Sequence, residues 1–142
     1  ISLRDGGGNF GPGLGPGASF RVGEWGGGMS VKTVVFVGGD RLGRGDDELG
    51  RALMLAAMKN LGKMEGGLPS HVMFMNAGVL LCCEGSHALA DLRGLSAAGV
   101  ELLCCGTCLD WFEKKSELTV GRVSTMVEIL SLMNSAERVM RI

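Results

Sequence analysis

The sequence of 142 residues contains no tyrosine, two tryptophans and five phenylalanines, so aromatic residues make up only 5% of the chain. Nine methionines predict a soft, largely aliphatic core. Net charge is also low, because 14 Lys and Arg nearly balance 15 Asp and Glu, and without a basic patch we expect no nucleic acid as partner. No apolar run reaches the roughly 18 residues of a membrane span, and no signal peptide is visible, so we expect a cytoplasmic protein and no membrane partner.

Cysteine is present five times, an odd number that includes two adjacent pairs, Cys82-Cys83 and Cys104-Cys105. Secreted domains held by disulfides are seldom laid out in this way, so a reducing compartment fits better. The most distinctive stretch is Cys105-Gly106-Thr107-Cys108-Leu109-Asp110, which follows an apolar run typical of a buried strand. A C-x-x-C after a strand in an α/β pattern indicates chemistry at sulfur.

Residues 1–30 contain eleven glycines, together with Pro12 and Pro16, and their apolar residues are scattered. We expect them to form a disordered Gly-rich leader or a non-native extension, because such a segment buries too little to offset its ordering entropy. Met29 would then be the native start, and Gly26-Gly27-Gly28 is what a translated ribosome-binding site can encode.

Beyond residue 30, strand-like and helix-like patterns alternate along the chain. This order predicts an α/β fold, a three-layer α/β/α domain over residues 31–142 with a mostly parallel five-stranded sheet. The expected strands are 31–37, 71–75, 100–104, 118–123 and 137–142. The expected helices are 46–61, 85–98, a short one from Thr107 and another from Thr125, where Thr125 and Glu128 form a T-x-x-E capping box.

Three of the helices are expected to bury one apolar face each, and in the helix over 85–98 the inward residues are expected to be Leu89, Leu92 and Leu95. In the first helix the inward residues are expected to be Leu49, Leu53, Ala56, Ala57 and Leu61. A second covered face, either a subunit contact or ordinary core, is expected at Met54, Leu55 and Met58. In the last helix the inward residues are expected to be Met126, Ile129, Leu130 and Met133.

Thr107 and Asp110 form a T-x-x-D capping box, so Thr107 is expected to be the N-cap of a short helix with Cys108 in its first turn. Backbone amides at that helix start would lower the pKa of the thiols of Cys105 and Cys108 and favour the thiolate.

Loops that follow parallel strands gather at one edge of the sheet, here the segments 38–47, 76–84 and 105–110. Cys82 and Cys83 are therefore expected near Cys105, whereas strand alternation sends Cys104 into the core. The Gly-rich loop over residues 38–45 has neither the G-x-x-x-x-G-K-[ST] nor the G-x-G-x-x-G spacing of phosphate-binding loops. The carboxylates of residues 46–48 would also repel phosphate, so no cofactor is expected. The two histidines, His71 and His87, are expected to be structural or solvated.

Several sequence blocks resemble the DsrE-like domain of the YedF family over roughly residues 31–142. The blocks are Val34–Gly38, Gly45–Gly50, Phe74–Val79, Glu84–Ser86, Gly99–Glu101, Cys105–Asp110 and Val120–Val123. The resemblance implies a sulfurtransferase-like protein linked to selenium metabolism, in the superfamily of the DsrE and TusD sulfur-relay subunits. It also implies a homo-oligomer, a trimer or a multiple of one.

In those relay subunits, a cysteine at the end of the third strand carries sulfur as a persulfide, and Cys105 is the matching position. Cys108 would then resolve or assist, and a cysteine desulfurase or a TusA-like carrier would donate the sulfur. Residues expected to stabilise the thiolate are Gly106, Thr107 and Asp110. Candidate accessory residues are Asn76, Gly78, Cys82 and Cys83.

Three other functions fit the same cysteines. Cys105 and Cys108 have the spacing of a dithiol redox pair, although no W-C-x-x-C-K context surrounds them. A metal site would use Cys82, Cys83, Cys105 and Cys108, but adjacent cysteines rarely chelate one zinc well, so no metal is assigned. In the last alternative the chain is a non-catalytic oligomeric scaffold whose thiols are incidental.

Overall fold

The computed structural model describes residues 32–142, so the expectations for residues 1–30, including the start at Met29, lie outside the described residues. Five parallel strands form one sheet in the order β4-β3-β2-β1-β5. The strands are β1 (Thr33–Val37), β2 (His71–Phe74), β3 (Glu101–Cys105), β4 (Arg122–Ser124) and β5 (Arg138–Arg141). The central strands are apolar and covered on both faces, as the β-branched runs predicted.

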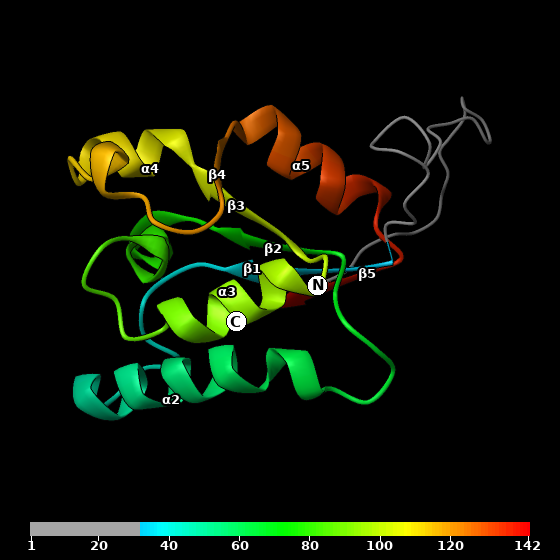
Figure 1. Cartoon of the computed structure of the whole chain (residues 1–142), viewed down its shortest axis with the longest axis horizontal. Helices are drawn as coiled ribbons and strands as arrows, with labels where there is room; N and C mark the ends of the chain where they lie inside the picture. The colour runs from blue at the N-terminus through cyan, green and yellow to red at the C-terminus, as the bar shows by residue number, and fades with distance from the viewer. Residues whose placement is uncertain (1–31) are drawn as a thin grey trace.

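Helices lie on both sides of this sheet, which confirms the three-layer α/β/α architecture. The helices are α2 (Asp47–Asn60), α3 (Leu89–Ala97), α4 (Gly106–Trp111) and α5 (Met126–Ser135). Figure 1 shows α2 and α3 below the sheet and α4 and α5 above it. Short 3-10 helices, η3 (Leu61–Lys63), η4 (Asn76–Cys82) and η5 (Lys115–Glu117), fill three of the connections. None of the helices within residues 32–142 is long and apolar enough to cross a membrane.

Two element boundaries differ from the sequence-based prediction because glycines place the backbone in the left-handed region. Gly85 has a φ of 91°, and the Ser86 hydroxyl accepts a hydrogen bond from the Ala88 amide. The helix α3 therefore begins at Leu89, four residues after its predicted start at Gly85. Gly121 has a φ of 86° directly before β4, which delays that strand to Arg122.

The prediction of the buried faces of α2 was partly wrong. Leu61, directly after the helix, is buried as predicted, and Met54 and Met58, expected on a second covered face, lie in the core. The buried residues of the helix are Gly50, Met54 and Met58, whereas the side chains of Leu49 and Leu53 are 56% and 43% exposed. The loop before the helix explains this rotation. The Leu42 amide donates to the Gly50 carbonyl over 2.9 Å, and a Cβ added to Gly50 would lie 3.1 Å from the Arg41 Cβ. A side chain at position 50 would crowd this loop, so glycine there favours the rotation that turns position 50 inward.

The predicted face of α5 was partly wrong. Ile129 and Leu132 are buried, but Met126 and Leu130 are 48% and 56% exposed. The orientation of Glu128 accounts for the difference. Its carboxylate pairs with Arg122 and accepts a hydrogen bond from Ser124, both on β4, which sets the rotation of the helix over the sheet. The short β4 strand therefore determines which apolar residues of α5 face the core.

Candidate functional site

Three chain segments meet where β1, β2 and β3 end. The Met75 amide donates to the Val37 carbonyl over 2.9 Å, which holds the start of η4 against the end of β1. Gly78 makes the approach closer still, because a Cβ added there would lie 2.6 Å from the Val37 carbonyl oxygen. The α4 helix, which continues from β3, completes the site through Cys108 and its contact with Asn76. The predicted gathering of loops at this edge is therefore confirmed.

Asn76 directs a backbone amide at sulfur. Its φ is 55°, in the left-handed region that asparagine adopts more readily than most residues. From this position its amide donates a hydrogen bond to the Cys108 Sγ over 3.0 Å. The sequence marked Asn76 as an accessory residue, but its role is that of the amide donor. The only sequence signal was an asparagine directly after a buried strand, where the chain must turn sharply.

Cys105 and Cys108 are neighbouring thiols, close enough for the Cys105 side chain to raise the pKa of Cys108. Cys105 is the N-cap of α4 and only 2% exposed, whereas Cys108 is half-buried and reaches the surface. Among the described residues, no backbone amide donates to the Cys105 sulfur. Cys108 is thus the member of the pair that both meets an amide and is open to an incoming molecule.

The expectation of a lowered thiol pKa is wrong for Cys108. Burial raises the pKa of the Cys108 thiol, and the adjacent Cys105 sulfur raises it further, while the Asn76 amide only partly offsets these effects. The helix α4 has six residues and begins at a buried strand end, so desolvation outweighs the favourable dipole. Cys108 at rest is a neutral thiol at neutral pH.

The predicted capping box at Thr107 is also corrected. Cys105 is the N-cap of α4, and Thr107 lies inside the first turn with its side chain exposed. Asp110 forms an ion pair with Lys115 at 3.1 Å instead of capping the helix. The helix starts earlier because Gly106 fits closely against β4, where a Cβ would lie 3.0 Å from the Val123 Cγ1. Stabilisation of a thiolate by Gly106, Thr107 and Asp110 stays a prediction.

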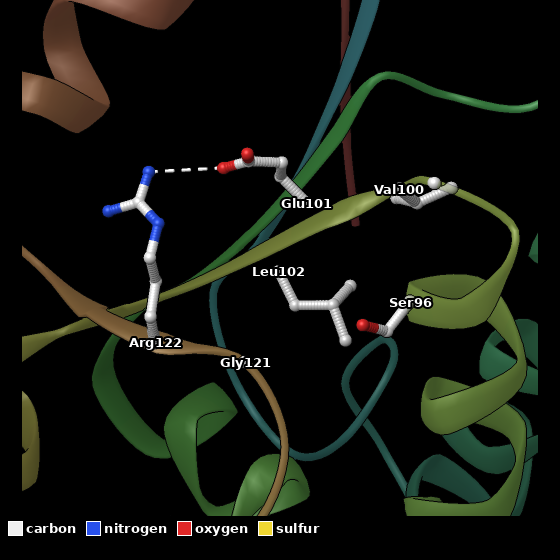
Figure 2. Close-up of a pocket in the computed structure, with 7 residues that line it drawn as sticks. Ser96, Val100, Glu101, Leu102, Gly121 and Arg122 are labelled. Carbon is white, nitrogen blue, oxygen red and sulfur yellow. Dashed lines mark hydrogen bonds and ion pairs between the residues drawn. The ribbon is translucent and has the colours of Figure 1, made fainter. Parts of the chain in front are cut away.

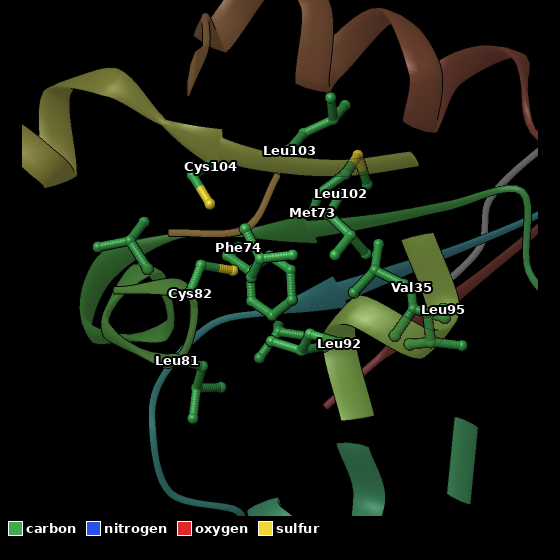
Figure 3. Packing of buried hydrophobic residues seen from close by; sticks show 14 of the residues in the cluster. Val35, Met73, Phe74, Leu81, Cys82, Leu92, Leu95, Leu102, Leu103 and Cys104 are labelled. Atoms are coloured by element: carbon green, nitrogen blue, oxygen red, sulfur yellow. The ribbon is translucent and has the colours of Figure 1, made fainter. Parts of the chain in front are cut away.

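The other three cysteines lie in the core. The Cys82 and Cys104 side chains have no exposed surface, and Figure 3 shows both sulfur atoms beside Phe74. Burial and the Cys104 thiol raise the pKa of Cys82 far above its usual range. The Cys83 thiol donates to the Val79 carbonyl over 3.3 Å. Cys104 is confirmed as a core residue, and Cys82 packs with it rather than with the exposed thiol.

Other candidate features do not add to the thiol site. Within residues 32–142, no group of three or more His, Cys, Asp or Glu side chains is arranged to hold a metal ion. A hollow of about 350 Å³ lies at the amino end of β3, opposite the thiols, beside the Arg122–Glu101 ion pair in Figure 2. His71 is buried and bonded to the Ser70 hydroxyl over 2.9 Å, which confirms a structural role, and His87 is exposed.

Comparisons with known proteins bear on the fold. No protein-family model and no curated protein matches the sequence. Among solved structures, the chain is similar to the YchN protein from E. coli, with a TM-score of 0.62 and 21% sequence identity. The match covers 80% of this chain and all of that one. This chain has the DsrE-like fold. The fold predicted from the resemblance is therefore confirmed, and it places the thiol pair at the strand-end edge where chemistry gathers in parallel sheets.

Proposed function

We propose that this protein is a sulfur-relay subunit that carries sulfur as a persulfide on the Cys105–Cys108 pair. The observation that supports it is the half-buried Cys108 sulfur. This sulfur accepts a hydrogen bond from the Asn76 amide over 3.0 Å and lies beside the Cys105 thiol. An amide donor stabilises negative charge on sulfur as charge develops during transfer. Because Cys105 is only 2% exposed, we place the first capture of sulfur on Cys108 rather than on Cys105.

The proposed capture begins when Cys108 loses its proton and its thiolate attacks the outer sulfur of a donor persulfide, R–S–SH. The S–S bond of the donor breaks, R–S⁻ leaves and takes up a proton, and Cys108 becomes Cys–S–SH. An acceptor thiolate then attacks the outer sulfur and restores Cys108. In the absence of an acceptor, the Cys105 thiolate attacks the inner sulfur, giving a Cys105–Cys108 disulfide and releasing HS⁻.

The finer parts of the proposal come from the sequence resemblance. The chain would be a YedF-type protein in which selenium can take the place of sulfur as cargo. A cysteine desulfurase or a TusA-like carrier would supply the persulfide. A reducing compartment such as the cytoplasm would keep the thiols of the described chain free, as all five are in the structure.

Labelling with sulfur tests this function. The protein is incubated with a cysteine desulfurase and sulfur-labelled cysteine, and bound label is measured before and after reduction by dithiothreitol. We expect label that is released by dithiothreitol, lost in Cys108→Ser and retained in Cys83→Ser, a matched control at a buried thiol. Label in Cys105→Ser is expected to persist, because no internal thiol discharges it. Absence of label on both the wild-type protein and Cys105→Ser, with the desulfurase shown to be active, contradicts the proposal.

A second candidate is a dithiol redox protein, and the neighbouring positions of the Cys105 and Cys108 thiols favour it. Its signature would be a reversible Cys105–Cys108 disulfide formed by a disulfide reagent without any sulfur donor. Titration against glutathione buffers, followed by mass spectrometry, separates the two. A redox carrier cycles fully between dithiol and disulfide and takes up no persulfide label, whereas the relay subunit acquires label.

A further inference from the structure

The outward side of α2 carries an apolar strip that the described part of the chain leaves exposed. The strip consists of Leu49, Ala52, Leu53 and Ala56, which we call the α2 strip. Figure 1 shows α2 as the outermost element on its side of the sheet. The helix buries its opposite side, Gly50, Met54 and Met58, in the core, so the strip is a second apolar face. A helix with two apolar faces has more apolar surface than its own core uses.

The shape of the α2 strip suits another helix. Leu49 and Leu53 are one turn apart, and the alanines at 52 and 56 leave a shallow groove beside them. Helix axes approach to about 8 Å where the side chains at the contact are small. The strip covers the middle of a 14-residue helix, so a partner helix would run along nearly all of its length.

The charges at the two ends of α2 indicate which helix fits. Three carboxylates, Asp46, Asp47 and Glu48, stand at its start, and Lys59 stands in its last turn. A second α2 lying antiparallel would bring each acidic end to a basic end. Parallel pairing would bring like charges together. The surface is therefore self-complementary, as an interface with two-fold symmetry requires.

We propose that two copies of this chain associate through their α2 strips, packed antiparallel about a two-fold axis between Ala52 and Leu53. In this register Leu49 meets Ala56 of the partner subunit, and Leu53 meets Ala52 of the partner subunit. Glu48 and Lys59 are eleven residues apart, about three helical turns, so both lie on the same flank of the strip. In this register Lys59 of the partner subunit lies two residues, or about 3 Å, along the axis from the level of Glu48, within reach of its long side chain, and this contact occurs twice.

The pairing is independent of the sulfur chemistry, because α2 and α4 lie on opposite sides of the sheet. The two thiol sites of such a dimer would face away from the interface and stay open. The interface also explains why Leu49 and Leu53, although periodic with the helix, are absent from the core of the single chain.

Sedimentation equilibrium of the full chain tests the proposal. We expect a reversible dimerisation or, in a larger assembly, a dimer step that Leu53→Glu abolishes, since two carboxylates would meet at the axis. Leu130→Glu on α5 changes a leucine that is 56% exposed, against 43% for Leu53, and is expected to leave the step intact. Because neither side chain is buried, both variants are expected to fold, and circular dichroism checks this.

Charge exchange provides the sharper measurement. Glu48→Lys and Lys59→Glu alone are each expected to weaken association by about tenfold, because two attractive contacts become repulsive. The double variant restores the attractive pairs and is expected to return the dissociation constant to within about threefold of the wild type. A monomeric wild type, a dimer that survives Leu53→Glu, or a double variant as weak as the single ones overturns the proposal.

Discussion

Because Gly78 has no side chain, η4 can pack closely against the end of β1. A methyl group there would lie 2.6 Å from the Val37 carbonyl oxygen, so the backbone must move. We predict that Gly78→Ala destabilises the protein by about 1–3 kcal/mol, the usual cost of overpacking, and weakens sulfur labelling by displacing the Asn76 amide.

Gly94 in α3 provides the matched control, because no atom lies within 4 Å of its added Cβ. Gly94→Ala is expected to stabilise the protein by about 0.5–1 kcal/mol through helix propensity. Urea unfolding of both variants makes the comparison. An unchanged unfolding midpoint in Gly78→Ala would show that η4 does not depend on this contact.

Cys108 is the residue whose protonation governs the first step. Because burial and Cys105 raise the pKa of its thiol, the rate of alkylation by iodoacetamide should rise with pH and reach half its maximum above about 8.5, the usual value for a free thiol. Cys105→Ser is expected to shift this midpoint downward, since it removes the neighbouring sulfur. A midpoint well below 8.5 in the wild type would mean that the free protein holds a thiolate.

Sequence reasoning located the thiol pair, and the family resemblance ranked Cys105 as the sulfur carrier, whereas the exposure of the two side chains favours Cys108. The C-x-x-C spacing and the strand before it place both residues at the edge of the sheet. Which sulfur is exposed depends on whether the helix starts at Gly106 or Thr107, and that depends on packing against Val123. The role of the Asn76 amide was equally hidden, because it depends on a contact between residues 32 positions apart.

At the scale of elements, the two capping boxes of the sequence behave differently. Thr125 is the N-cap of α5, and its hydroxyl accepts the Glu128 amide over 3.1 Å, as predicted. Thr107 has the same local pattern but lies inside α4. Where the flanking chain is free to adopt the local pattern, as at Thr125, that pattern determines the N-cap of the helix. At the end of a strand, as at Thr107, tertiary packing determines the N-cap instead.

This contrast gives a paired prediction. Thr125→Ala is expected to cost about 1 kcal/mol in the free energy of unfolding, the typical value of a lost N-cap. Thr107→Ala is expected to change it by less than about 0.5 kcal/mol, because its side chain is exposed and makes no capping bond. Equal losses in the two variants, measured by urea unfolding, would contradict this assignment of the caps.

Helix faces were predicted less well than helix positions. The 3.6-residue period identified α2 and α5, yet both helices have apolar residues on more than one side, so the period alone could not choose the inner face. In α2 the choice is made by the loop that packs on Gly50, and in α5 by the Glu128–Arg122 pair. These are tertiary contacts, which a single sequence does not reveal.

For the whole molecule, His71 couples stability to pH. It begins β2, is 7% exposed and lies near Glu101, Arg122 and Glu128 on β3, β4 and α5. Burial is the largest effect and lowers its pKa below the ordinary 6.5, although both carboxylates act in the opposite direction. The unfolded chain therefore binds the proton more readily, and stability must fall as pH drops below about 6.5.

We predict that the urea midpoint decreases between pH 7 and pH 5 and that His71→Gln flattens this part of the profile. His87→Gln, at an exposed position, is the control and is expected to leave the slope as in the wild type. A profile that His71→Gln does not alter would assign the pH dependence to other groups.

The most direct measurement of the relay function locates the transferred sulfur itself. After reaction with a persulfide donor, mass spectrometry of the intact protein and its fragments identifies the modified residue. Our account predicts one additional sulfur atom on Cys108 in Cys105→Ser, the same adduct or the Cys105–Cys108 disulfide left by its discharge in the wild type, and no adduct in Cys108→Ser. An adduct that persists unchanged in Cys108→Ser, or that is found only on Cys105, would contradict the assignment of Cys108 as the first acceptor.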